Sequence, residues 1–411
     1  MTEYLIESVG LCLRWLHVVA AIAWIGESFY FVALDRGLKP PKVPGQGLYG
    51  ESWSVHGGGF YHKQKYLPAP AELPPDLHWS KWKSYTTWLS GFALFAILYL
   101  RSPNLYLVDP AIAELGNHQA VGLALAFLIV GWIAYDLLCK AVGFRDRLLG
   151  VFVGVLVLAI SYAATHLFAG RAAFLLVGAV LATIMSANVF FVIIPGQKRL
   201  VAALTRGEIP DPTPGLRGKQ RSVHNTYFTL PVVFAMLATH YATAFAHPHS
   251  WLVLALFMAA GALIRQFFVL WHSGDRAWWL LGMGAALLVA VFAWMAPKAD
   301  ESTANAADST SNIASIARAY DTSLTGPVGI ATIQPIIQRH CVGCHSAKPT
   351  IMASAPLGTV FDTDAQIEAG ALKIHQQTVV LKVMPLGNIT RMTDTERALI
   401  GRWFDARPLS D

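Results

Sequence analysis

The sequence predicts an all-α fold: a polytopic membrane bundle of about eight transmembrane helices, followed by a small α-helical domain. Three observations support this prediction. Of the 411 residues, 55% are hydrophobic and only 14% are charged, whereas a soluble domain usually carries about 25% charge. The apolar residues gather into separate runs of about 20 residues, the length that a helix needs to cross a bilayer. From residue 322 onward no such run occurs, and apolar and polar residues alternate.

Eight apolar runs are long enough to be membrane spans. The second run is the shortest, and the fourth and fifth are separated by so few residues that they predict a helical hairpin. The first run is expected to remain as a transmembrane helix, because the residues before it lack the positive charges that open a signal peptide. The eight runs are 9–34, 85–101, 118–138, 148–168, 171–194, 226–246, 251–271 and 277–297.

Beyond the last span, the composition changes twice, which divides the chain into a membrane domain (1–297), a linker and a C-terminal domain. Residues 298–321 are rich in Ala, Ser, Thr and Asp, as flexible linkers are. Residues 322–411 form the C-terminal domain, whose last helix begins with a capping box made by Thr393 and Glu396. Helices are expected in this domain at Ile333–Arg339, Asp364–Gln376 and Asp394–Phe404.

The charges of the loops predict the orientation in the membrane. The loops after spans one, three, five and seven contain most of the Lys and Arg residues, whereas the loops after spans two, four and six contain only Arg101 and Arg171. Positively charged loops stay in the cytoplasm. We therefore expect the N-terminus and the C-terminal domain on the periplasmic side of a bacterial inner membrane. The net charge of +6 comes from the positive residues of these loops. It therefore indicates the orientation in the membrane and does not predict nucleic-acid binding.

The C-terminal domain contains Cys341-Val342-Gly343-Cys344-His345, a C-x-x-C-H motif. In this motif the two thiols form thioethers with the vinyl groups of a haem, and the histidine binds the iron. A redox C-x-x-C pair or half of a zinc site are the alternatives, but the sequence has no second cysteine pair to complete a zinc site. The domain is therefore expected to be a c-type cytochrome with one covalent haem c.

The iron of this haem requires a sixth ligand from a later part of the chain. Met384, in the segment VMPLGN, is the favoured candidate, because Pro385 stiffens the loop that presents the sulfur. Met392 is the second choice and Met352 the third. A Met/His ligand pair raises the reduction potential, which suits an acceptor of electrons.

Four histidines are expected in the outer half of the membrane bundle: His17, His118, His166 and His240. Ionisable residues inside a membrane usually face the bundle interior and mark function. Any one of them alone is more often a hydrogen-bonded polar residue than a ligand. Together they suggest a haem b held by two of them, with Arg14 one turn before His17 available for a propionate. Copper is the other metal that imidazoles suit.

A second polar set lies deeper in the bundle and consists of Glu27, Asp136, Asn188, Arg265 and Gln266. Arg265 is expected about 21 Å from the outer surface by helix rise, and a buried arginine needs an anion. Either Asp136 or Glu27 provides that anion in a structural ion pair, or the anion is a substrate. Gln266 follows Arg265 at an angle of about 100° around the helix, so the two side chains need not face one pocket.

Four segments of the membrane domain have a recognisable family pattern: HVVAAIAWIGESFYF (17–31), WSVHGGGFYHKQKY (53–66), WKSYTTWLSGFAL (82–94) and GNHQAVGLALAFLIVGWIAYDLL (116–138). Together with CVGCH and VMPLGN, they resemble the bacterial membrane-bound urate oxidases, also called urate hydroxylases of the PuuD type. The first segment also resembles membrane protoporphyrinogen oxidases and copper-resistance proteins. The GGGFYHKQKY loop joined to a c-type domain is the more specific combination.

The resemblance implies that urate is oxidised to 5-hydroxyisourate with oxygen from water, and that the electrons pass to the protein's own cytochrome domain. A downstream cytochrome oxidase or another respiratory acceptor would then receive them. Urate is planar and anionic, so the fork of donors on Arg265 suits it, and a base must take a proton from water. Arg265, Gln266 and Glu27 are the candidate catalytic residues, and His56 and His62 are further candidates for the base. Urate releases two electrons and haem c accepts one, so a second carrier such as haem b is needed.

Two other functions are compatible with the sequence. The first is a membrane electron-transfer cytochrome, linked to a quinol or to a partner protein and without urate chemistry, which predicts two or more haems. The second is a protein that handles copper or a porphyrin, although the sequence contains no methionine-rich copper pattern. Reduction of the haem by urate distinguishes the enzyme from both.

Overall fold

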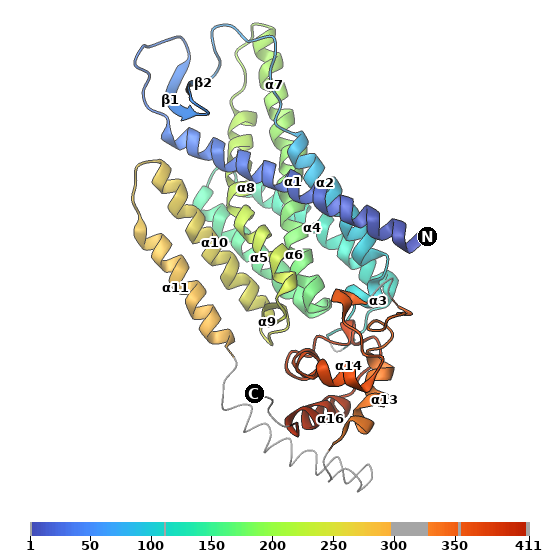
Figure 1. Cartoon of the computed structure of the whole chain (residues 1–411). Coiled ribbons are helices and arrows are strands. Elements are labelled where there is room, and N and C mark those ends of the chain that lie inside the picture. Colours follow the sequence, from blue (N-terminus) through green and yellow to red (C-terminus); the bar gives the residue numbers. More distant parts are fainter. Residues whose placement is uncertain (1, 111, 297–327, 352–354, 408–411) are drawn as a thin grey trace.

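The computed structural model describes residues 2–110, 112–296, 328–351 and 355–407. The expected linker at 298–321 lies outside the described residues. The described chain forms a bundle of long helices, with the small C-terminal domain at one end of the bundle (Figure 1). The architecture therefore has two parts, the bundle of long helices and the C-terminal domain at its end.

Helices occur at all eight expected spans, and six of them are long and apolar enough to cross a membrane. The six are α1, α4, α5, the continuous run α6–α7 at 170–205, α10 and α11. The protein is thus a helical membrane protein, as the apolar runs predict. The long helices are α1 (Thr2–Gly37), α2 (Trp82–Phe95), α4 (Asn117–Val142), α5 (Asp146–Leu167), α6 (Gly170–Ala187), α7 (Ile194–Thr205), α8 (Thr213–Leu237), α10 (Ser250–His272) and α11 (Trp278–Met295).

Short elements join the long helices. A π-helical turn, η1 (Ala96–Leu100), extends α2, and a second one, η2 (Asn188–Ile193), joins α6 to α7. The other short pieces are α3 (Pro103–Tyr106), η3 (Ala238–His240) and α9 (Ala242–Phe245). The α2 helix has only 14 residues before its π turn. Together, α2 and η1 correspond to the second apolar run, which is the shortest.

The start of α8 differs from the sequence prediction. The helix begins at Thr213, with Pro214 in its first turn, where the missing N–H of proline costs no hydrogen bond. The apolar run at 226 is therefore only its second half. Arg217 and Arg221, which the loop-charge argument assigns to a loop, lie on this helix, and Arg221 is buried with 4% exposure.

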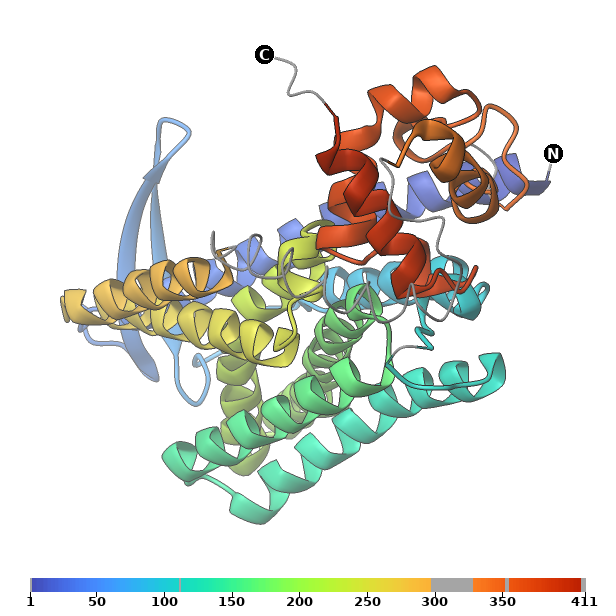
Figure 2. The same ribbon diagram turned by 90° about the horizontal axis from the view of Figure 1, so that it is seen from below.

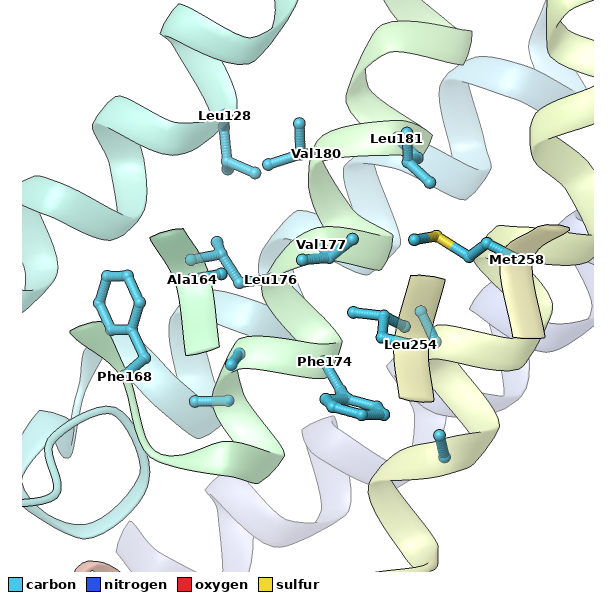
Figure 3. Close-up of a cluster of buried hydrophobic side chains, with 14 of the residues drawn as sticks. Leu128, Ala164, Phe168, Phe174, Leu176, Val177, Val180, Leu181, Leu254 and Met258 are labelled. Atoms are coloured by element: carbon cyan, nitrogen blue, oxygen red, sulfur yellow. The ribbon is translucent and has the colours of Figure 1, made fainter. Parts of the chain in front are cut away.

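The core of the bundle is centred on α6. Phe174 and Leu181 of α6 point toward Leu254 and Met258 of α10, and Val180 of α6 points toward Leu128 of α4 (Figure 3). Small residues allow this close packing. A Cβ atom on Gly131 of α4 would lie 2.6 Å from Val180, so α4 and α6 approach each other only because glycine stands there.

The all-α prediction omits a β-hairpin in the segment between α1 and α2. Strand β1 (Leu48–His56) pairs antiparallel with β2 (Gly59–Tyr66). Gly57 and Gly58 form the turn with φ of +56° and +80°, a left-handed pair that suits a tight hairpin turn. The hairpin is attached to α1 by an ion pair of 2.7 Å between Lys65 and Asp35.

The C-terminal domain is a small helical unit with its own apolar core, which includes Ile333, Ile367 and Trp403. Its last helix has the predicted capping box, in which the Thr393 hydroxyl accepts from the Glu396 backbone N–H and the Glu396 side chain reaches back. Its elements are α13 (Ile330–His340), η5 (Pro356–Gly358), α14 (Asp364–Ala369), α15 (Ala371–His375), η6 (Gln376–Val380), η7 (Leu386–Asn388) and α16 (Asp394–Asp405).

The C-terminal domain covers only part of its end of the bundle, beside α2 and α3 (Figure 2). A close approach between the two involves Gly387, which has a φ of +59°. A Cβ atom on Gly387 would lie 2.8 Å from the Val108 carbonyl oxygen and 3.2 Å from that of Asn104. Glycine is therefore required at this position both for the backbone conformation and for the contact.

Candidate functional site

Arg265 is a buried arginine that forms no ion pair with a carboxylate of the described residues. The residue lies in the middle of α10 and is 3% exposed. Two of its nitrogens, Nε and Nη2, are buried and have no hydrogen-bond partner among the described residues. The guanidinium lies 4.1 Å from the centre of the Phe29 ring of α1. A buried charge in this state is costly unless a ligand completes it.

Tyr227 and Gln266 form a polar pair beside this arginine. The Tyr227 hydroxyl of α8 donates a hydrogen bond to Oε1 of Gln266 on α10. Tyr227 also lies close enough to Arg265 for the two groups to interact electrostatically. Three helices, α1, α8 and α10, therefore bring an aromatic ring, a phenol, an amide and an open guanidinium to one place.

The two carboxylates that could have neutralised Arg265 are bound elsewhere. Glu27 accepts from Lys83 Nζ at 2.8 Å and from the Ser80 hydroxyl. Asp136 forms ion pairs of 2.7 Å with both Arg221 and Lys140. The prediction of a structural ion pair between Arg265 and one of these two carboxylates is therefore wrong. The structure also does not bring Glu27, a candidate catalytic residue, into contact with Arg265.

Arg221, which binds Asp136, belongs to a buried polar network that the sequence analysis missed. The predicted member Asn188 accepts from Arg221 at 3.2 Å and donates to Asn225 at 2.9 Å. His224 lies 2.7 Å from the Tyr135 hydroxyl. The signal in the sequence was the spacing of Arg221, Asn225 and Thr229, which places polar side chains on one face of a helix.

The four predicted membrane histidines differ in their surroundings. His17 donates from Nδ1 to the Thr87 carbonyl at 2.9 Å and packs against Gly91, where a Cβ would lie 2.7 Å from the ring. His166 is exposed, and its Nδ1 is bound to the Tyr162 carbonyl at 2.7 Å. His118 and His240 are exposed as well. Within the described ranges, no hydrogen bond or ring contact joins any two of the four.

The CVGCH segment directly follows α13. Cys341 is 8% exposed, and burial raises the pKa of its thiol to about 12. Cys344 is more accessible, and both thiols are free. His345 donates from Nδ1 to the Thr359 carbonyl at 3.1 Å, which leaves Nε2 available. A carbonyl partner of this kind fixes the ring orientation of a ligating histidine.

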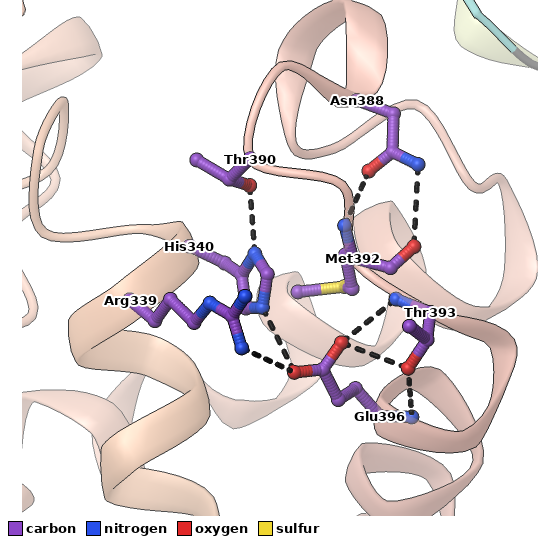
Figure 4. A network of polar contacts seen from close by, with 7 residues as sticks. All are labelled: Arg339, His340, Asn388, Thr390, Met392, Thr393 and Glu396. Carbon is purple, nitrogen blue, oxygen red and sulfur yellow. Dashed lines mark hydrogen bonds and ion pairs between the residues drawn. The ribbon is translucent and has the colours of Figure 1, made fainter.

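The two described methionines of the ligand region are held differently. Met392 is 3% exposed and belongs to the apolar core of the domain. The amide of Asn388 bonds its backbone at 2.9 and 3.2 Å (Figure 4). Met384 is only half-buried, and its carbonyl accepts from the buried Arg397 at 2.8 Å. Met384 is therefore the freer of the two sulfurs, and Met352 lies outside the described residues.

A second network, centred on Glu396, fixes the segment between Met384 and α16. Its carboxylate accepts from the Thr393 backbone N–H at 2.7 Å and lies 3.1 Å from His340 Nε2 (Figure 4). The other ring nitrogen of His340 lies 2.7 Å from the Thr390 hydroxyl. Burial opposes ionisation of Glu396, but the hydrogen bonds from Thr393 and His340 outweigh it and lower the pKa of this carboxyl.

Aromatic rings lead from the bundle to the C-terminal domain. The ring centres of Phe95 and Tyr99 are 5.7 Å apart, and those of Tyr99 and Tyr106 are 5.5 Å apart. Tyr106 of α3 lies within electrostatic range of Cys344 and of Arg171. The CVGCH segment thus faces a part of the membrane domain that is rich in aromatic and basic side chains.

Comparison with known proteins identifies the membrane domain. A sequence profile described as urate oxidase N-terminal matches residues 3–296 of the chain. The chain belongs to this urate oxidase family. The resemblance inferred from the sequence segments is therefore confirmed for the membrane domain, whereas the c-type cytochrome domain stays a prediction. No curated protein and no solved structure matches the chain.

In this member of the family, the matched residues include the whole membrane bundle, and thus Phe29, Tyr227, Arg265 and Gln266. The CVGCH segment lies beyond them. Among the described residues, no three His, Cys, Asp or Glu side chains are placed to hold a metal ion. The open donors of Arg265 can bind a planar anion with two parallel hydrogen bonds, as arginine does with carboxylates.

Proposed function

We propose that this protein is a membrane-bound urate hydroxylase, which oxidises urate to 5-hydroxyisourate and sends the electrons to a haem c on its C-terminal domain. Urate and water give 5-hydroxyisourate, two electrons and two protons, so oxygen comes from water and no peroxide forms. Membership of the urate oxidase family supports the substrate. The observation that supports the site is the buried Arg265 with two unpartnered donors.

Urate binds to Arg265 as an anion in this proposal. Nε and Nη2 donate to adjacent acceptors of the planar ring, which replaces the missing carboxylate and offsets the cost of the buried charge. Phe29, whose ring already contacts the guanidinium, provides an aromatic face for stacking. Tyr227 and Gln266 are the polar groups that we assign to orienting the attacking water.

We assign Glu27 to positioning and not to proton transfer. It precedes Phe29 by two residues, and therefore points about 200° away from it around α1. Its carboxylate is bound to Lys83 and Ser80 near the start of α2, so it holds α1 against α2. In the hairpin, His62 is bound to Glu51 at 2.9 Å and stacks on Trp53; no described contact brings it to Arg265, so we do not assign it as the base.

The C-terminal domain has the residues to hold a haem c. Cys341 and Cys344 would form the thioethers, His345 would bind the iron through its free Nε2, and Met384 would be the sixth ligand. A haem bound there accepts electrons one at a time. In the membrane domain, the orientation of His17 by Thr87 supports it as a ligand of a haem b, with His118, His166 or His240 as its partner.

The same proposal places the protein in the membrane. We propose that α2 and α8 also cross the bilayer, which gives eight spans, and that the N-terminus and the cytochrome domain face the periplasm of a bacterium. α8 is less apolar than the other spans because its polar residues Arg221, Asn225 and Thr229 are buried in the bundle. A cytochrome oxidase or another respiratory acceptor would then take the electrons from the outer side.

An anaerobic visible spectrum tests this function. Full-length protein is purified in detergent from a host that attaches haem c, oxidised, and mixed with urate in ¹⁸O-labelled water. We expect the c-type alpha band to appear within the turnover time and the label to enter the product. A second band at longer wavelength in the same trace would establish the haem b.

The variant Arg265→Gln tests the site, and Arg206→Gln is its matched control, because Arg206 is exposed and paired only with Glu208. We expect loss of reduction by urate in Arg265→Gln alone, while dithionite still reduces the haem in both. If dithionite reduces the wild-type haem and urate does not, urate chemistry is excluded, and quinols become the donors to test.

A further inference from the structure

A cavity of about 290 Å³ lies between the last turns of α4, the π turn η2 with α7, and the first turns of α8. The helices α7 and α8 extend to the end of the bundle that is opposite the C-terminal domain (Figure 1). α4 and the run of α6–α7 are among the apolar helices that can span a membrane. The cavity therefore opens where these spans leave the hydrocarbon layer, at the level of lipid headgroups.

The charges that line this cavity are mostly positive. Lys140, Arg199, Arg217 and Arg221 line it, together with only one carboxylate, Asp136. Asp136 is already bound by Arg221 and Lys140 at 2.7 Å each. Its charge is thus used within the wall, and the cavity as a whole remains positive.

Two of the arginines that line the cavity have no ion-pair partner among the described residues. Arg199 of α7 and Arg217 of α8 are both exposed, and neither forms an ion pair within the described ranges. Asp211 interacts electrostatically with both at longer range. An anion placed between the two helices would therefore meet donors from Arg199 and Arg217, with Lys140 beside them.

Aromatic side chains form another part of the cavity wall. Trp132, Phe144 and Phe191 line the same space as the basic side chains. Phe144, in the turn between α4 and α5, and Phe191 of η2 are 53% and 60% exposed, and apolar side chains exposed at this depth face lipid tails. A ligand that fills this cavity must combine an anionic head with apolar chains.

We propose that this cavity binds the phosphate headgroup of an anionic phospholipid. Basic pockets between membrane helices hold such headgroups through charge-assisted hydrogen bonds from Lys and Arg. The phosphate lies between Arg199 and Arg217, and the acyl chains run along Phe144 and Phe191 into the bilayer. The residues that line this cavity do not include Arg265, Tyr227 or Gln266, so the lipid site is separate from the proposed urate site.

Native mass spectrometry of the full-length protein in detergent tests the proposal. The double variant Arg199→Gln/Arg217→Gln removes the two free charges, and Arg145→Gln/Arg147→Gln is the control, because these exposed arginines lie at the same end of the bundle but do not line the cavity. Short-chain phosphatidylglycerol and phosphatidylcholine are titrated against each protein. We expect the affinity for phosphatidylglycerol to fall by about 30-fold in the cavity variant, from two cations near an anionic surface, and to change little in the control.

Three results would overturn the proposal. Equal losses in the two double variants would indicate a general surface-charge effect. Equal affinity of the wild type for phosphatidylcholine and phosphatidylglycerol would exclude recognition of an anionic head. Inorganic phosphate that binds the wild-type cavity while added lipid does not displace it would show a site for a free anion. Thermal unfolding of both variants, measured alongside, separates loss of binding from loss of folding.

Discussion

Arg221 and Arg265 are both buried arginines on neighbouring helices, with 4% and 3% exposure, but their surroundings differ. Arg221 on α8 binds Asp136 at 2.7 Å and Asn188 at 3.2 Å. Arg265 on α10 has the Phe29 ring at 4.1 Å and two nitrogens that find no partner in the described part of the chain. The same side chain thus completes a structural network at one place and leaves binding capacity open at the other.

The difference has an energetic meaning. Desolvation of a buried ion costs several kcal/mol, whereas a cation–π contact returns only about 2 kcal/mol when it is shielded from water. Phe29 therefore offsets only part of the cost at Arg265. Asp136 and Asn188 compensate Arg221 much more fully. Stability can explain Arg221, but it does not explain why Arg265 is there.

The largest expected effect is on activity at Arg265. We expect Arg265→Gln to lower the rate of urate-dependent haem reduction by about 10²- to 10³-fold, because a buried charged hydrogen-bonding group that binds the substrate is lost. The melting temperature should stay the same or rise, because an unpaired buried charge is removed. Stopped-flow spectroscopy and thermal unfolding in detergent measure the two quantities.

The opposite pair of results, a lower stability with an unchanged rate, would contradict the difference between Arg265 and Arg221. If Arg265→Gln lost stability while keeping its rate, Arg265 would be a structural residue like Arg221. Arg265→Lys separates charge from shape, because lysine keeps the charge but not the fork of donors. We expect its rate to remain close to that of the Gln variant.

The next effect is on stability at Arg221. We expect Arg221→Gln to lower the free energy of unfolding by about 3 kcal/mol, since Asp136 keeps only Lys140 as its partner. The melting temperature should fall by several degrees. Thermal unfolding in detergent, followed by size-exclusion chromatography, measures this change.

The second substitution Asp136→Asn tests the cause of that loss. In the Arg221→Gln background it should recover part of the stability, because it removes the uncompensated carboxylate. Additive losses in the double variant would show that Arg221 stabilises the bundle through its ring contact with Tyr135, 4.9 Å away, and not through Asp136.

The sequence predicted the bundle well, because lipid demands long apolar helices and these are visible as runs. It misplaced Arg221, since positive charges near a span were assigned to a loop, and only the partner Asp136, distant in the sequence, reveals that the residue is inside. The hairpin at 48–66 was missed, although Gly57 and Gly58 are a local turn signal. Its exposed aromatic residues resemble those of an interfacial loop.

The candidate site was predictable to a lesser degree. Arg265 and Gln266 stand out because polar residues are rare in an apolar run. Phe29 and Tyr227 do not stand out, since aromatic residues are common in membrane helices and only the packing of α1, α8 and α10 selects them. The CVGCH segment was recognisable because its chemistry is contained in five consecutive residues.

A smaller effect on the rate of haem reduction is expected at Tyr227, which tests the role of the polar pair beside Arg265. Tyr227→Phe removes the hydroxyl that donates to Gln266 but keeps the ring. The rate of haem reduction by urate should fall by about 5- to 10-fold, as for the loss of one hydrogen bond of about 1 kcal/mol. Tyr99→Phe, outside the site, is the control, and an equal loss there would favour a role in electron transfer over a role in the site.

The smallest effect is expected at Glu396, a compensated carboxylate outside the membrane. Its pKa is lowered in the folded domain, so the stability it adds is present at neutral pH and is lost as the pH falls through the lowered value. As the pH falls from 6 to 3, unfolding of the C-terminal domain, followed by haem absorbance in the full-length protein, should become easier. Glu396→Gln should flatten this dependence of stability on pH.

Glu368→Gln is the control. It breaks an exposed ion pair with Arg407 and should leave the pH dependence unchanged, because exposed pairs contribute little. Equal flattening in both variants would show that the acid sensitivity comes from the net charge of the domain and not from the buried contact of Glu396 with His340.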